Sequence, residues 1–118
     1  MNSVNDYMNK LYQIVDNRDA DSLANFLDED VCFKFSNAEQ VTGKMAVLDI
    51  NRHFFHSIEK MSHTLEGVWQ QGTESICNGT VDYIRKDGSH YSARFATILT
   101  IKDGLITKYR IYADVSGL

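Results

Sequence analysis

The acid/base chemistry available to this sequence centres on a histidine and a tyrosine, His63 and Tyr109, which fall in predicted strands among apolar residues. An imidazole can take up or release a proton near neutral pH, and a phenol can donate a hydrogen bond to a reacting oxygen. His63 has the same strand parity as Leu65 and Trp69, which would place it at the wall of an apolar cavity. We therefore predict His63 and Tyr109 as candidate catalytic residues. The alternative for His63 is a hydrogen-bonded position where a helix meets a strand.

Aromatic side chains would supply most of the wall of that cavity. Trp69, Tyr83 and Tyr109 could place polar tips among apolar groups, as ligand sites do, although each also fits an ordinary core position. We predict that a small apolar ligand contacts side chains from both halves of the chain: Tyr12, Phe33, Phe35, Phe54, His63, Trp69, Tyr83, Phe95, Thr97, Tyr109 and Ile111.

One helical stretch carries residue types that bind metals. Asp49, His53 and His56 have i, i+4 and i+7 spacing, which sets them on roughly one helix face. That face lies largely opposite the apolar stripe containing Ile50 and Phe54, so we predict a solvated polar face. Neither a metal site nor a cofactor site is expected.

Composition narrows the function classes. With 118 residues, the chain suits a single domain, and its net charge of −4 disfavours binding to a phosphate backbone. No apolar run reaches the roughly 18 residues of a membrane span, and the first residues lack the pattern of a signal peptide, so we expect a cytoplasmic protein. Cys32 and Cys77 lie in apolar stretches, which favours reduced, buried thiols.

Hydrophobic periodicity predicts two helices in tandem over residues 3–17 and 19–27. The acidic residues 28–30 are expected in a solvated loop, followed by a short strand over residues 31–35 with period-two alternation. After Gly43, a third helix with a broad apolar face is predicted to run to about Lys60.

The remainder of the chain indicates antiparallel strands. Strands are predicted over residues 63–69, 74–85 and 89–101, and a turn at Asp103-Gly104 leads into a final strand that ends at Asp114. Asn78-Gly79 could form a hairpin turn, but we prefer one strand with a bulge at Gly79.

Alternation along the final strand divides its side chains into two sets. We assign Tyr109, Ile111 and Ala113 to the cavity side, and the opposite side to solvent or a partner subunit: Lys108, Arg110, Tyr112 and Asp114. A bulge that reversed the parity would instead place Arg110 and Asp114 inside as a charged pair.

Two helices, a strand, a longer helix and a run of strands make an α+β roll. Several short motifs occur in this order: Asn17–Asp21, Phe33–Ala38 with Thr42–Lys44, Tyr83–Gly88, and Asp103–Ile106 with Tyr109–Asp114. With these motifs the chain resembles, over residues 1–118, the SnoaL-like proteins of the NTF2-like superfamily. The resemblance implies a cone-shaped fold in which three helices and a curved, mostly antiparallel sheet enclose an apolar cavity.

The resemblance also implies a range of functions. The superfamily includes ketosteroid isomerases, limonene epoxide hydrolases, polyketide cyclases, scytalone dehydratases and non-catalytic modules, commonly as dimers through the sheet. We expect a protein that binds a small hydrophobic molecule, with acid/base chemistry of the isomerase, cyclase or dehydratase type. The alternative is a non-catalytic dimerisation or protein-association module, and in either case we expect a homodimer through the outer sheet face with Arg110 and Tyr112.

The best-known catalytic residues of the superfamily do not match. The isomerase tyrosine would align with Leu11, its base with Lys34 or Phe35, and its second acid with Thr97. The hydrolase carboxylate of the last strand would align with Ile111. Neither constellation is therefore expected.

Overall fold

The computed structural model describes residues 3–118. Three helical segments lie in the first half of the chain: α1 (Ser3–Asp16), α2 (Ala20–Leu23) with a 3-10 turn at Ala24–Phe26, and α3 (Lys44–Ser57). The strands are β1 (Leu27–Phe35), β2 (Val41–Thr42), β3 (Lys60–Gln71), β4 (Glu74–Ile84), β5 (His90–Lys102) and β6 (Leu105–Ala113).

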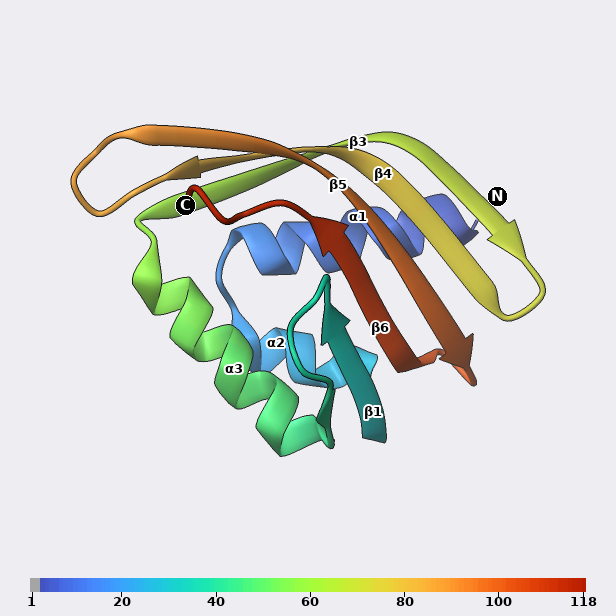
Figure 1. The fold of residues 1–118 in the computed structure, drawn as a ribbon. Helices are drawn as coiled ribbons and strands as arrows, with labels where there is room; N and C mark the ends of the chain where they lie inside the picture. Colours follow the sequence, from blue (N-terminus) through green and yellow to red (C-terminus); the bar gives the residue numbers. More distant parts are fainter. Residues whose placement is uncertain (1–2) are drawn as a thin grey trace.

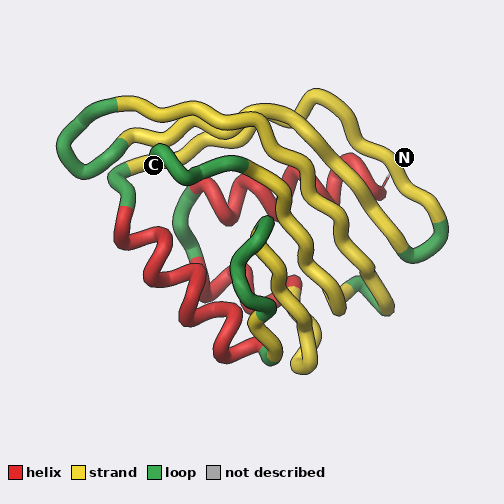
Figure 2. The backbone as a smooth tube through the Cα atoms, viewed as in Figure 1, coloured by secondary structure: helices red, strands yellow, loops and turns green. Residues whose placement is uncertain are grey.

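The six strands form one sheet in the order β2-β1-β6-β5-β4-β3. All neighbouring strands are antiparallel except β1 and β6, which run parallel. The long strands curve strongly, with α1 beneath them and packed against β3, while α3 packs against β1 (Figure 1). Figure 2 shows the helices on one side of the sheet. The predicted α+β cone, with a curved and mostly antiparallel sheet, is confirmed.

Local chemistry accounts for the helix boundaries. In α1, apolar residues recur every three or four positions, and Met8 and Leu11 are fully buried. Asp19 caps α2 by accepting a hydrogen bond from the Ser22 N–H at 3.1 Å. α3 is shorter than predicted, because Ile58 adopts an extended conformation and ends the helix at Ser57.

Two strand boundaries differ from the predictions. The acidic residues 28–30, expected in a loop, belong to β1, where Leu27 is buried and already pairs with Ile106 of β6. The short edge strand β2 was not predicted. It pairs with β1 through only two residue pairs, so it leaves no periodic pattern in the sequence.

Asn78 and Gly79 lie within one continuous strand, as preferred, but the bulge is on the neighbouring strand β3. Leu65 pairs with Gly79 and Gly67 pairs with Asn78, which leaves Glu66 as the extra residue. A Cβ on Gly79 would lie 1.9 Å from the backbone oxygen of Thr64. The bulge therefore requires a glycine opposite it.

The inward and outward sides of β6 are as predicted. A register shift occurs between Thr100 and Ile101 of β5, where β6 contributes Thr107 as its extra residue, and the alternation is regular from Lys108 onward. Tyr109 is buried, whereas Arg110 turns outward and donates hydrogen bonds to Glu74 Oε2 at 3.2 Å and Thr100 Oγ1 at 2.9 Å. An inward Arg110–Asp114 pair is thus absent from the described residues.

Candidate functional site

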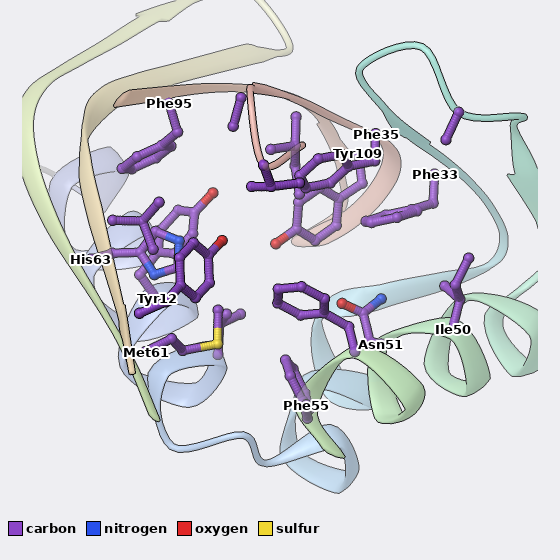
Figure 3. Close-up of a pocket in the computed structure, with 18 residues that line it drawn as sticks. Tyr12, Phe33, Phe35, Ile50, Asn51, Phe55, Met61, His63, Phe95 and Tyr109 are labelled. Carbon is purple, nitrogen blue, oxygen red and sulfur yellow. The ribbon is translucent and has the colours of Figure 1, made fainter. Parts of the chain in front are cut away.

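A cavity of about 250 Å³ lies between the helices and the concave side of the sheet (Figure 3). Aromatic and aliphatic side chains from α1, β1, α3, β3, β4, β5 and β6 line most of it. Most of the side chains predicted to surround a ligand do line it: Tyr12, Phe33, Phe35, Phe54, His63, Tyr83, Phe95, Tyr109 and Ile111. Thr97 and Trp69 do not.

His63 is bound to a carboxylate that the sequence analysis did not select. The Nδ1 atom of His63 lies 2.6 Å from Oδ1 of Asp16, and the backbone N–H of His63 donates to Oδ2 of the same carboxylate at 2.9 Å. Only 8% of the His63 side chain and 23% of the Asp16 side chain are exposed. Because a carboxylate accepts hydrogen bonds, the neutral imidazole carries its proton on Nδ1, and Nε2 is the basic nitrogen.

Aromatic rings hold the imidazole in place. The ring of Tyr12 lies 4.4 Å from that of His63 between centroids, and the ring of Phe95 meets the imidazole edge-on at 4.9 Å. Within residues 3–118, no hydrogen bond joins Nε2 of His63 to another residue. The basic nitrogen is therefore left for a molecule in the cavity.

Two buried phenols, Tyr12 beside the imidazole and Tyr109, line the cavity. The Tyr12 hydroxyl is hydrogen bonded to Oγ1 of Thr97, and burial raises the pKa of Tyr12 well above its ordinary value, reinforced by Tyr109 and Cys77 nearby. Burial likewise raises the pKa of Tyr109 above its ordinary range. Both phenols are thus neutral donors at physiological pH. Thr97 lies behind Tyr12 and supports it instead of lining the cavity.

Tyr83 contributes a third phenol to the cavity wall. Burial is the main cause that raises its pKa to about 12, with further contributions from the nearby Asp16 and Tyr91. Its ring packs edge-on against Phe54, 5.8 Å away between centroids.

Asn51 is a polar cavity residue that was not predicted from the sequence. It lies on α3 with its Nδ2 donating to the backbone oxygen of Val47 at 2.8 Å. Its position three residues before Phe54, on the same helix face, was the available signal.

Trp69 does not line the cavity, which corrects the predicted position. The bulge at Glu66 reverses the alternation of β3, so His63 and Trp69 lie on opposite sides of the sheet despite their matching parity. Trp69 pairs with Ile76 on the outer face, and 53% of its surface is exposed.

Metal-binding side chains do not gather anywhere in residues 3–118. Asp49, His53 and His56 are all exposed on the outer side of α3, and Nδ1 of His53 lies 2.9 Å from the backbone oxygen of Asp49 within the same helix. None of the helices described in residues 3–118 is long and apolar enough to cross a membrane.

Solved structures share this fold. An NTF2-like protein of unknown function from Burkholderia pseudomallei has a TM-score of 0.86 at 16% identity, with 99% of this chain and 95% of that chain covered. An LEH-like epoxide hydrolase from M. tuberculosis has a TM-score of 0.81 at 16% identity, with 93% and 81% covered. A protein with a ketosteroid isomerase-like fold from Catenulispora acidiphila, in complex with trimethylamine, has a TM-score of 0.84 at 14% identity, with 93% and 86% covered.

No curated protein matches the chain. The sequence profile of the SnoaL-like domain matches residues 8–109, which include most of α1, all of β1 to β5 and the first part of β6 as far as Tyr109. The chain therefore belongs to the SnoaL-like domain family.

Proposed function

We propose that this protein binds a small, mostly apolar carbonyl compound in the cavity and moves a proton on it, with His63 as the acid/base group. The observation that carries this proposal is the 2.6 Å contact between Nδ1 of His63 and Oδ1 of Asp16. It fixes which nitrogen holds the proton and stabilises the imidazolium that forms when Nε2 accepts a second proton. If His63 served only to link α1 to β3, it would not have to line the cavity as well.

The surrounding groups suit proton transfer next to a carbonyl. Nε2 of His63 would take a proton from the carbon beside the carbonyl, and the electron pair of that C–H bond would form the enolate. The neutral hydroxyls of Tyr12 and Tyr109 would donate to the enolate oxygen, and the proton would return to a different atom or leave with a departing hydroxyl. This is chemistry of the isomerase, cyclase or dehydratase type.

The size of the cavity limits the ligand. Its volume of about 250 Å³ is below the roughly 300–1,000 Å³ common for ligand pockets. Compounds of one or two rings, such as terpenoid or aromatic polyketide fragments, therefore fit the proposal better than four-ring steroids.

Deuterium exchange tests this function without the natural substrate. The protein is incubated in D2O with a panel of cyclic and aromatic ketones, and the label at the carbon beside the carbonyl is followed by NMR, with thermal shift as the binding assay. His63→Gln should lose exchange by at least about a hundredfold while the ligand still raises the melting temperature. His53→Gln, a change of an exposed histidine on α3, is the matched control.

If deuterium entered a ligand as fast with the His63→Gln variant as with the wild-type protein, the acid/base role of His63 would be contradicted. If no compound raised the melting temperature of the wild-type protein, the binding role would fail as well.

A homodimer through the outer face of the sheet is a second proposal. Trp69 and Tyr112 are 53% and 47% exposed there. Exposed aromatic side chains on one surface favour a partner that covers it.

Light scattering tests the dimer. The wild-type protein should have the mass of a dimer, and the Arg110→Glu, Tyr112→Ala double variant that of a monomer. Met45→Ala is the control, because Met45 is 78% exposed but lies on α3. A monomeric wild-type protein at micromolar concentration would overturn this proposal.

A further inference from the structure

The amide of Asn51 has one fixed orientation in the wall of the cavity. Its Nδ2 donates to the backbone oxygen of Val47 at 2.8 Å, and a carbonyl oxygen can only accept a hydrogen bond. The amide nitrogen must therefore face the helix, which leaves Oδ1 as the free end. Figure 3 shows the Asn51 oxygen on the cavity side of the group and the nitrogen turned away from it.

Neither helix formation nor core packing accounts for an asparagine at this position. Asparagine is a poorer helix former than alanine or leucine, and its side chain competes for backbone groups. The hydrogen bond to Val47 stays within one turn of α3, so it does not join Asn51 to another element. The neighbouring cavity residues on the same side are apolar, among them Phe33, Phe35 and Ile50 (Figure 3). Oδ1 of Asn51 is thus an acceptor among apolar side chains that has no hydrogen-bond partner of its own among residues 3–118 and can accept one from a ligand.

Asn51 and His63 lie on opposite sides of the cavity (Figure 3). The cavity thus has His63 at one side and Asn51 at the other, and the rest of its lining is apolar apart from the phenols of Tyr12, Tyr83 and Tyr109. Its small volume means that a compact ligand near His63 also extends toward Asn51.

We propose that Asn51 selects ligands that carry a hydroxyl group at the end away from the carbonyl, through a hydrogen bond to its Oδ1. This inference rests on the proposed function for the position of the carbonyl at His63. The ligand class is accordingly a hydroxylated ketone of one or two rings, such as a phenolic ketone. Asn51 acts as a specificity-determining residue and takes no part in the proton transfer.

A matched pair of two-ring ketones tests the selection. The probes are 1-tetralone and 6-hydroxy-1-tetralone, which differ only by a hydroxyl at the end opposite the ketone. The wild-type protein should bind the hydroxylated probe about threefold to tenfold more tightly, as one neutral hydrogen bond allows. Asn51→Leu, close to asparagine in shape, should bind both probes with the same affinity, whereas Asn51→Asp keeps an acceptor and should retain a preference for the hydroxyl.

Two controls separate this inference from the proposed function. Asn9→Leu removes an exposed helical asparagine of α1 and should keep the wild-type preference. His63→Gln should lose deuterium exchange into 1-tetralone and still prefer the hydroxylated probe. A melting curve for each variant verifies that it is folded.

The outcomes are distinct. If the wild-type protein binds both probes equally, or if Asn51→Leu keeps the preference, the role of Asn51 is overturned while the proton-transfer function stands. If neither probe binds to the wild-type protein, the phenolic ketone class is overturned. If 1-tetralone binds but does not exchange, the proton-transfer function fails for that ketone, and the preference for the hydroxyl still decides the role of Asn51.

Discussion

Asp16 binds His63 twice, through a contact between Oδ1 and Nδ1 at 2.6 Å and a backbone hydrogen bond to Oδ2 at 2.9 Å. The two residues are 47 positions apart, on the last turn of α1 and on β3. One carboxylate therefore orients the imidazole and also fastens the helix to the sheet. Because both contacts come from one carboxylate, a change at Asp16 affects the tautomer of His63 together with the stability of the fold.

Asp16→Asn tests this double role. The amide is a weaker acceptor than the carboxylate, so the imidazole should populate both tautomers, and the free energy of unfolding should fall by about 1–3 kcal/mol. Long-range nitrogen–proton NMR of the His63 ring reports the tautomer, and urea unfolding reports the stability. Asp6→Asn, a change of an exposed acid earlier on α1, should alter neither. An unchanged tautomer in Asp16→Asn would show that the carboxylate does not orient the ring.

Replacement of two glycines by alanine tests the bulge of β3. Gly79→Ala should lower the free energy of unfolding by about 3 kcal/mol, since its Cβ would lie 1.9 Å from the backbone oxygen of Thr64 and a strand would have to move. Gly67→Ala is the comparison, because its Cβ would meet the Trp69 ring at 2.3 Å. That ring lies on the exposed face and can rotate, so this change should cost less than about 1 kcal/mol. Equal costs in urea unfolding would contradict the account of the bulge.

Sequence periodicity predicted the cavity strands well where they are regular. On β6 the register shift precedes Lys108, so the alternation correctly placed Tyr109 and Ile111 inside and Arg110 outside. On β3 the extra residue falls between His63 and Trp69, and the same rule then placed Trp69 on the wrong side. A bulge depends on how two strands pair, and the pattern of one strand does not encode that pairing.

The polar contacts of the site were harder to predict than its apolar wall. The residues of an apolar stripe can be recognised from their spacing within one segment of the sequence. The hydrogen-bond partner of a histidine can come from any element that the fold brings near it, so no local spacing indicates it. Asp16 follows Val15 at the end of a helix, where an acidic residue has no distinctive pattern. Tyr12 and Thr97 were both selected as cavity residues, but their contact across 85 positions, with Thr97 behind the wall, became visible only in the structure.

The buried phenols predict a loss of stability at alkaline pH. Burial raises the pKa of Tyr7 and Tyr83 to about 12, and that of Tyr12 and Tyr109 above their ordinary values. An unfolded tyrosine ionises near pH 10, so the folded protein binds more protons than the unfolded chain above that pH. This contribution to stability is complete below about pH 10 and is lost as the pH rises from about 10 to 12 and beyond.

Urea unfolding as a function of pH checks this prediction. The free energy of unfolding should fall steadily above about pH 10. The ultraviolet absorbance of tyrosinate should rise at a higher pH in the folded protein than in the unfolded chain. Tyr12→Phe removes one shifted phenol, so its stability should fall less steeply over the same range. If the free energy of unfolding fell equally steeply with pH in the variant and the wild-type protein, folding would not raise the pKa of Tyr12.

Residues 114–118, which follow β6, are held in place by Arg85 and Tyr91. The Arg85 guanidinium donates to the backbone oxygens of Gly117 at 2.8 Å and Leu118 at 3.3 Å, and it lies over the ring of Tyr91. The Tyr91 hydroxyl donates to the backbone oxygen of Asp114 at 2.8 Å. Val115, which lies between these attachment points, lines the cavity. Release of this segment would thus open one part of the wall.

Arg85→Lys should loosen the segment, because a lysine has a single nitrogen and cannot reach both oxygens in the same geometry. The amide of Leu118 donates to the backbone oxygen of Val115 at 2.9 Å, so it reports the opening, and its hydrogen exchange should become about tenfold faster. Since Val115 lines the cavity, any bound ketone should also dissociate faster. Lys86→Ala is the control, because Lys86 is the adjacent, exposed cation and has only a 4.0 Å ion pair with Glu59. Unchanged exchange at Leu118 in Arg85→Lys would mean that the segment is held by its apolar contacts and not by the guanidinium.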